Sequence, residues 1–258
     1  MTFNIRPLAA SLLLLAAAVP TFDTARAQSF SPDQRGEIEK IVREYLLRNP
    51  EILQEVVQEM ERRQAQADAD KHREAIKEHT AALFNSTRQV VLGNPQGDVT
   101  MVEFFDYNCG FCRKALEDKI ALMKADPKLR LVLKEFPVLG EGSTQAAQIA
   151  VAVRMQDKTG GRKYFEFHQK MFASRGQVDR ARALAVVREI GFDTARAEKD
   201  SAGNETKQTL EEVFKLAEAL GINGTPTYVV GQQVVVGAVG QDKLRDAINT
   251  ARCGKATC

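Results

Sequence analysis

Two cysteines separated by two residues carry the clearest chemistry in the sequence. Cys109 and Cys112 follow the apolar run 102–105 and directly precede a segment with helical periodicity. Thiols at this spacing can close a small disulfide, and a thiolate in the first turn of a helix is stabilised by unpaired backbone amides and the helix dipole. Because a thiolate attacks disulfides and a thiol does not, the pattern predicts an exchange site with Cys109 as nucleophile and Cys112 as resolving thiol.

A second cysteine pair, Cys253 and Cys258, lies at the C-terminus after the last expected helix. We interpret it as a small structural disulfide, with a second redox pair or an intermolecular link as the alternatives. A zinc site built from all four cysteines is disfavoured, because redox chemistry already explains a pair at a helix start. The sequence therefore predicts neither a metal nor another cofactor.

The N-terminus has the features of a secretory signal peptide. Arg6 precedes an apolar run at 8–19, and Ala25-Arg26-Ala27 forms an A-x-A cleavage pattern, which predicts removal of residues 1–27. The run is too short to span a bilayer. Four cysteines in an exported chain fit an oxidising compartment, so we expect the periplasm. A formal net charge of +2 gives no indication of a nucleic-acid or membrane-surface partner.

The segment 28–86 reads as helical. One-sided apolar stripes at 33–47 and 52–60 flank Asn49-Pro50, which ends the first helix and starts the second. Residues 61–80 are almost all charged residues, glutamine and alanine, with Ile76 the only large aliphatic, so we expect this helix to have nothing to bury. Short amphipathic helices must cover their apolar faces. We favour self-association through a stalk; the alternative is docking on the catalytic domain.

From residue 87 the pattern changes to buried strands alternating with helices, which predicts an α/β domain. Two strands lead into the first cysteine pair, and a helix and a third strand complete a β-α-β unit. Helices then fill the middle of the domain before two closing strands and a helix. The expected elements are residues 90–92, 99–105, 109–125, 129–136, 143–156, 163–173, 179–190, 205–220, 227–230, 234–236 and 241–252.

This order resembles the thioredoxin fold in its DsbA-family form. The features that carry the resemblance are the run Glu-Phe-Phe-Asp-Tyr-Asn-Cys-Gly-Phe-Cys at 103–112 and the Thr225-Pro226 dipeptide before the penultimate strand. The resemblance spans about 90–252. It implies a thioredoxin-like catalytic domain at 87–258, with a helical insertion at about 141–220.

The N-terminal helices and the Asn-Cys-Gly-Phe-Cys sequence look most similar to the Com1-like and ScsC-like (suppressor-of-copper-sensitivity C) branch. In that branch N-terminal helices drive trimerisation and isomerase activity. The resemblance therefore implies that 28–86 is an oligomerisation segment, that the protein is a homo-oligomer, and that a trimer is an expected form.

The resemblance also implies roles for four further residues. Glu103 stands where the family keeps a buried acid, which could relay the proton that Cys112 must lose. Lys134 lies in the strand that could reach Glu103; the alternative is that the two form a purely structural pair. The Thr225-Pro226 peptide bond is expected to be cis, presenting the Thr225 backbone to an extended substrate.

We therefore expect a periplasmic thiol-disulfide oxidoreductase that acts on exported proteins with cysteines. Gly110 and Phe111 carry no charge, unlike the histidine of the strongly oxidising DsbA type, and resemble the Gly-Tyr of the isomerase branch. This favours an isomerase or reductase supplied by a DsbD-like membrane reductant. The alternatives are a dithiol oxidase recharged by a DsbB-like partner and a non-catalytic copper-binding or chaperone module.

Overall fold

The computed structural model describes residues 30–258, so the expected signal peptide at 1–27 lies outside the described residues. The chain divides into two compact units, Met1–Gln58 and Glu59–Cys258, which are described separately. None of the helices within residues 30–258 combines the length and the apolar character needed to cross a membrane.

The described part of the first unit contains helix α1, Pro32–Arg48, and the beginning of α2, Glu51–Glu78. Ser31 caps α1: its hydroxyl accepts from the Gln34 amide, and the Gln34 side chain accepts in return from the Ser31 amide. This reciprocal pair satisfies two otherwise free donors at the helix start. No residue of α1 is buried within a single chain, and its large apolar side chains, Ile38, Ile41, Val42, Tyr45 and Leu47, are exposed.

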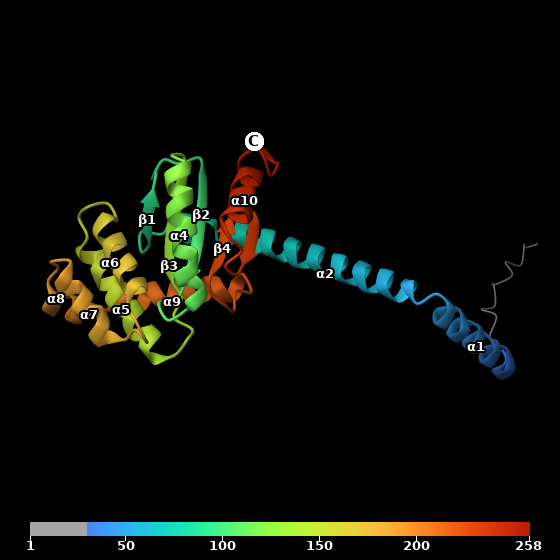
Figure 1. Cartoon of the computed structure of the whole chain (residues 1–258). Coiled ribbons are helices and arrows are strands. Elements are labelled where there is room, and N and C mark those ends of the chain that lie inside the picture. Colours follow the sequence, from blue (N-terminus) through green and yellow to red (C-terminus); the bar gives the residue numbers. More distant parts are fainter. Residues whose placement is uncertain (1–29) are drawn as a thin grey trace, which may run out of the picture. The chain divides into compact units, whose positions relative to one another are not determined.

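The second unit is built on a five-stranded sheet in the order β1-β3-β2-β4-β5 (Figure 1). β2 and β3 run parallel and every other neighbouring pair is antiparallel. Helix α4, Gly110–Ala125, connects the parallel pair, which is the β-α-β unit that the sequence predicts. The strands are β1 Val90–Gly93, β2 Val99–Phe105, β3 Leu129–Glu135, β4 Thr227–Val230 and β5 Gln233–Val236.

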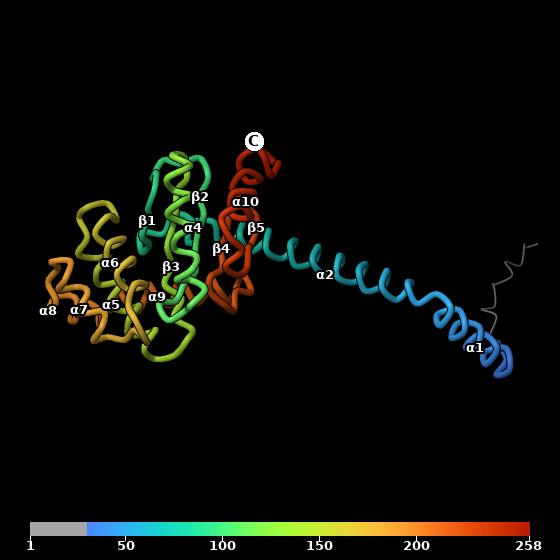
Figure 2. The backbone as a smooth tube through the Cα atoms, in the orientation of Figure 1, coloured from blue at the N-terminus to red at the C-terminus, as the bar shows by residue number. Residues whose placement is uncertain are grey.

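The helical insertion contains five helices where the sequence predicts four. The additional helix is α8. Its N-cap residue is Asp193, whose carboxylate accepts from the Arg196 amide. In Figures 1 and 2 the helices α5 to α8 gather beside the β1 edge of the sheet. The helices are α5 Glu141–Gln156, α6 Arg162–Ala173, α7 Arg180–Glu189, α8 Thr194–Ser201 and α9 Asn204–Ala219.

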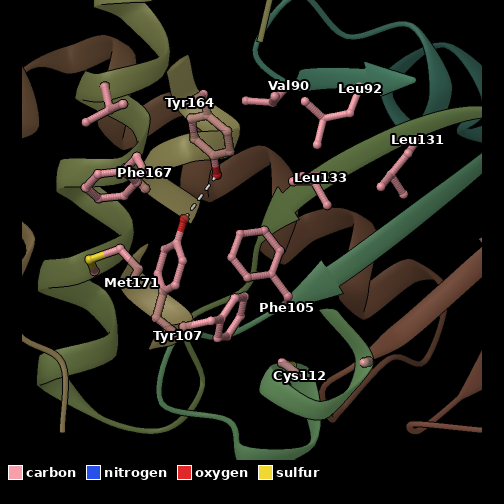
Figure 3. Packing of buried hydrophobic residues seen from close by; sticks show 14 of the residues in the cluster. Val90, Leu92, Phe105, Tyr107, Cys112, Leu131, Leu133, Tyr164, Phe167 and Met171 are labelled. Atoms are coloured by element: carbon pink, nitrogen blue, oxygen red, sulfur yellow. Dashed lines mark hydrogen bonds between the residues drawn. The ribbon is translucent and has the colours of Figure 1, made fainter. Parts of the chain in front are cut away.

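Strand alternation sends side chains to two hydrophobic cores, one on each face of the sheet. Phe105 and Tyr228 face the larger core, which α4, α6 and α10, Gln241–Cys253, cover. Phe104 and Val229 face the smaller core beneath α9. In the larger core the hydroxyls of Tyr107 and Tyr164 point toward one another at 3.4 Å (Figure 3).

The N-terminal boundary of the second unit differs from the sequence prediction. The compact unit begins at Glu59 and not near residue 86, because Ile76 of α2 and Leu83 of α3, Thr80–Phe84, are buried in the core beneath α9. The expectation that the polar helix has nothing to bury is therefore wrong at its C-terminal end. One aliphatic side chain, Ile76, is enough to pack the end of α2 into the core on this face of the sheet.

Candidate active site

The end of β2 delivers the first cysteine pair to the start of α4. After Phe105 the chain turns: the Asp106 carboxylate accepts from the Asn108 amide at 2.8 Å, and the Cys109 amide donates to the Asp106 carbonyl at 3.1 Å. Cys109 then becomes the N-cap of α4, and its sulfur accepts from the Cys112 amide at 3.3 Å. The nucleophile expected from the sequence thus lies where the free amides of a helix N-terminus converge.

The buried Asp106 carboxylate also binds a second segment of the site. It accepts from the amides of Val138 and Leu139, at 2.9 and 3.0 Å, and from the Ser143 hydroxyl at 2.7 Å. These groups belong to the loop after β3 and to the start of α5. Asp106 therefore holds the cysteine loop and the β3–α5 loop in a fixed relation.

Asn108 extends this connection into the helical insertion. Its side chain donates to the Ser143 hydroxyl at 3.0 Å and to the Val178 carbonyl at 2.9 Å, and it accepts from the Val178 amide at 2.7 Å. Neither Asp106 nor Asn108 was expected from the sequence to belong to the site. The signal that could have found them is an aspartate two residues before a polar residue at a strand end, a spacing that favours an Asx turn.

The two cysteines have opposite electrostatic environments. The hydrogen bond from the Cys112 side chain, with help from the amides of Cys112 and Phe111, lowers the pKa of Cys109 to about 5 against the opposing effect of burial. Burial raises the pKa of Cys112 far above its ordinary value, and the Cys109 and Glu103 side chains add to this. At neutral pH Cys109 is therefore a thiolate and Cys112 a thiol. Cys109 keeps 6% of its surface exposed, and Cys112 none.

The loop before β4 lies against the nucleophile. The Thr225-Pro226 peptide bond is cis, as the sequence predicts, and the Cys109 sulfur is 3.2 Å from the Thr225 carbonyl oxygen. The Gly237 amide donates to the Pro226 carbonyl at 2.8 Å and ties this loop to the chain after β5. Two segments 116 residues apart in sequence thus meet at this sulfur.

Glu103 is fully buried on β2, and its partner is not the one expected. Lys119 of α4 donates to its carboxylate, so the predicted pairing with Lys134 is wrong. Burial raises the pKa of Glu103, and the charge of Lys119 opposes that rise.

The sheet register explains the correction. Lys134 lies opposite Phe104, whereas Glu103 lies opposite Leu133, so alternation sends the lysine to the other face. There its ammonium donates to the Ala82 carbonyl at 2.9 Å and to Gln89 at 3.2 Å, and burial lowers its pKa to about 8.

The sequence contains a feature from which the role of Lys119 as a buried partner could have been predicted. The buried positions of α4 are Cys112, Ala115, Lys119 and Leu122, one face of a helix. A lysine within an apolar stripe must find a buried partner of opposite charge, because an unpaired buried ammonium is very unfavourable.

Comparisons with known proteins now decide the family. The model of the family "DSBA-like thioredoxin domain" matches residues 100–249 of this chain. The model of the family "Copper resistance protein ScsC N-terminal domain" matches residues 34–67. The chain belongs to the DsbA-like thioredoxin family. It is a thiol-disulfide oxidoreductase of the DsbA/ScsC type, and its thioredoxin-like fold follows an ScsC-type N-terminal segment.

Individual relatives agree with this membership. A thioredoxin-like oxidoreductase from Silicibacter pomeroyi DSS-3 is 44% identical, with 67% of this chain and 96% of that chain covered and a TM-score of 0.63. ScsC from Proteus mirabilis, in a transitional conformation, is 25% identical, with 88% and 98% covered and a TM-score of 0.63. Disulfide bond formation protein D of Bacillus subtilis is 26% identical over 179 residues, 65% of this chain and 78% of that protein.

The second cysteine pair of this DsbA-like protein lies apart from the first. Cys253 and Cys258 are joined by a disulfide, with 6.2 Å between their Cα atoms, at the exposed C-terminal end of α10. Within residues 30–258, no three His, Cys, Asp or Glu side chains are grouped so that they could hold a metal ion. Of the predicted site residues, the fold thus brings Cys109, Cys112, Glu103 and the Thr225-Pro226 loop together, and places Lys134 and the C-terminal pair elsewhere.

Proposed function

We propose that the protein is a periplasmic disulfide isomerase or reductase that exchanges disulfides with exported proteins through Cys109 and Cys112. The observation that carries this proposal is the pairing of a thiolate at the start of α4 with a fully buried thiol in the next turn, beside an internal carboxylate. Such a pair supplies a nucleophile at neutral pH and a second thiol that reacts only after losing its proton.

The reaction begins when the Cys109 thiolate attacks a substrate disulfide. One substrate sulfur leaves as a thiolate, and the other is bound to Cys109 in a mixed disulfide. In isomerisation a different substrate thiolate displaces Cys109, which restores the Cys109 thiolate and leaves a rearranged substrate. No net electrons are transferred in that cycle.

In reduction, Cys112 resolves the mixed disulfide. Its thiol proton passes to Glu103, the new thiolate attacks the Cys109 sulfur, and the substrate departs as a second thiolate while a Cys109–Cys112 disulfide forms. Two electrons from a DsbD-like membrane reductant then open the Cys109–Cys112 disulfide: Cys112 takes back the proton held by Glu103, and Cys109 returns to its thiolate form. Because the Glu103 charge is close enough to raise the pKa of Cys112, the carboxylate is well placed to receive this proton.

The surface around Cys109 suits unfolded or partly folded substrates. Phe111 beside the nucleophile is 63% exposed, and Val138 and Leu139, which Asp106 binds, are also exposed. Exposed apolar residues gathered at a reactive group are typical of an interaction surface. An extended substrate segment would pair with the backbone at Thr225.

A dithiol oxidase recharged by a DsbB-like partner is the second candidate, and the pKa of Cys109 favours it. A value of about 5 lies between about 7 for thioredoxin and about 3.5 for DsbA, a strong oxidant whose reduced form is stabilised. The two candidates require opposite resting states. An isomerase must be kept reduced in the cell, and an oxidase must be kept oxidised.

Trapping the thiols in cells with an alkylating mass tag separates these candidates. We expect Cys109 and Cys112 to be mostly reduced; a wholly oxidised pair would establish the oxidase instead. Refolding of scrambled ribonuclease tests the chemistry itself. Recovery with the wild type and none with Cys109→Ala would exclude a non-catalytic copper-binding or chaperone role.

Self-association through the first unit is part of this proposal. The apolar side chains of α1 are uncovered within one chain, and this region matches the ScsC N-terminal domain. We expect a homo-oligomer, with a trimer as the leading form. A variant lacking residues 28–58 keeps Ile76 and Leu83 in the core, so light scattering on it and on the full chain provides a clean test. If the full chain and this variant both have the mass of a monomer, residues 28–58 have no role in oligomerisation.

A further inference from the structure

Two buried polar atoms next to the resolving thiol have no hydrogen-bond partner among residues 30–258. They are Oε1 of Glu103 and the hydroxyl of Tyr228, and both residues are fully buried. Buried polar groups are almost always satisfied, so two such atoms in one place require an explanation.

The sheet places these two side chains together. Glu103 of β2 and Tyr228 of β4 are directly opposite in the antiparallel register. Opposite residues project from the same face with Cβ atoms about 5 Å apart. Tyr228 is also two residues after Pro226, so the strand that carries the substrate-facing loop also carries this hydroxyl.

The surrounding groups keep the Tyr228 hydroxyl protonated. Burial raises its pKa far above the ordinary value, and the charges of Glu103, Asp118 and Cys109 add to that rise. Tyr228 is therefore a hydrogen-bond donor throughout the working pH range. The other carboxylate oxygen of Glu103 is bound by Lys119, and the residue opposite Glu103 on β3 is the apolar Leu133. Two other buried titratable groups are affected by this ion pair: burial and nearby carboxylates, Glu103 among them, raise the pKa of Tyr107, and burial and the charge of Lys119 lower that of His168.

We propose that Tyr228 is a positioning residue for the resolving step: its hydroxyl donates to Oε1 of Glu103 and holds the carboxylate ionised and oriented to receive the Cys112 proton. The inference rests on the proposed role of Glu103 as that proton acceptor. The proton moves from the Cys112 sulfur to Glu103, and the tyrosine keeps its own proton throughout. Lys119 and Tyr228 would then serve one carboxylate oxygen each.

The test is the pH dependence of resolution in Tyr228→Phe, which removes only the hydroxyl. Stopped-flow mixing of the reduced full-length protein with an aromatic disulfide reports formation of the mixed disulfide on Cys109 and then its resolution by Cys112. Without the donated hydrogen bond the pKa of Glu103 rises. We expect the acid limb of the resolution rate to move up by about one pH unit, a tenfold lower rate on that limb, with the full rate recovered at higher pH.

Tyr164→Phe is the matched control. Tyr164 is also fully buried, but its hydroxyl donates to Glu135, at the end of β3. We expect this variant to lose stability without moving the acid limb. A Tyr228→Phe protein that folds, by circular dichroism, and keeps the wild-type pH profile would overturn the inference.

Glu103→Gln separates this inference from the function on which it rests. If Glu103 accepts the proton, this variant loses the acid limb altogether, and adding Tyr228→Phe changes nothing further. A wild-type limb in Glu103→Gln would refute the role of the carboxylate itself. A limb that changes in Glu103→Gln and stays in Tyr228→Phe refutes the role of the tyrosine alone.

Discussion

The two cysteine pairs of this protein have the same chemical groups but lie at opposite ends of their helices: the first pair at a helix start, the second at a helix end. Cys109 begins α4, where backbone amides point toward its sulfur, and Cys253 ends α10, where carbonyl groups are left without partners. The positive end of a helix dipole stabilises a thiolate and the negative end destabilises it. The first pair is therefore poised for exchange, and the second is better suited to remain a closed disulfide.

The two pairs also differ in burial and in their neighbouring residues. Cys112 lies in the core beside the buried Glu103–Lys119 pair, whereas the C-terminal disulfide is exposed. Next to that disulfide, Arg252 binds Asp98 and Asp126, the residue that ends α4. The 16 residues of α4, about 24 Å at 1.5 Å per residue, thus separate the two pairs.

Removing each cysteine pair in turn tests this difference most directly. We expect Cys109→Ser to abolish the reduction of insulin, because an alcohol cannot replace the attacking thiolate. The double variant Cys253→Ser/Cys258→Ser should retain wild-type activity in the same turbidity assay. Comparable losses in both proteins would show that the C-terminal pair takes part in electron transfer.

The next largest effect should come from the loop that presents Cys109. Asp106→Asn places an amide where the carboxylate accepts backbone and hydroxyl donors, so the two loops lose their fixed relation. A displacement of about 1 Å can cost about a hundredfold in rate, and we expect a loss of that order in kcat/KM for a protein substrate.

Asp157→Asn is the control for this prediction. The Asp157 carboxylate also accepts two backbone amides, from Thr159 at 2.6 Å and Tyr164 at 2.9 Å, but at the start of α6. It should lower the midpoint of thermal unfolding and leave the turnover of the folded protein unchanged. Equal activity losses in the two variants would reduce Asp106 to a residue that only supports the fold.

The two pairs should also differ in how alkylation depends on pH. With a pKa of about 5, Cys109 should react with iodoacetamide at a constant rate near neutral pH and about tenfold more slowly for each pH unit below 5. In Cys109→Ser/Cys112→Ser, the reduced C-terminal thiols should react faster as the pH rises through about 8.5 or higher. A shared midpoint would contradict the effect of the helix ends.

The smallest effect should be the contribution of the C-terminal disulfide to stability. It joins cysteines only five positions apart at an exposed chain end, so loop-closure entropy sets an upper limit of about 2 kcal/mol. Urea unfolding of Cys253→Ser/Cys258→Ser should show a decrease below that limit. A larger decrease would mean that the tail supports the packing of α10 on the sheet.

The cysteine pair at a helix start and the β-α-β unit were predicted from the sequence, and the cis Thr225-Pro226 bond from the family resemblance. These features depend on residues close together in the chain or on a motif with a fixed place in the fold. Sequence reasoning chose the wrong partner for Glu103, because proximity of strands suggested Lys134 while the register directs that side chain to the opposite face. The sequence-based boundary near residue 86 also differs from the start of the compact unit at Glu59, because no neighbouring residue indicates that Ile76 packs against the sheet.

The chain by itself determined which sulfur sits at a helix start, because neighbouring residues encode the strand end, the turn and the helix. Only the tertiary structure decided that Thr225 faces Cys109, that Lys119 neutralises Glu103, and that Asp106 joins two loops. Those contacts depend on sheet register and on how helices pack across it. Both are properties of the whole fold, and the same short segment could satisfy its own local preferences with other partners.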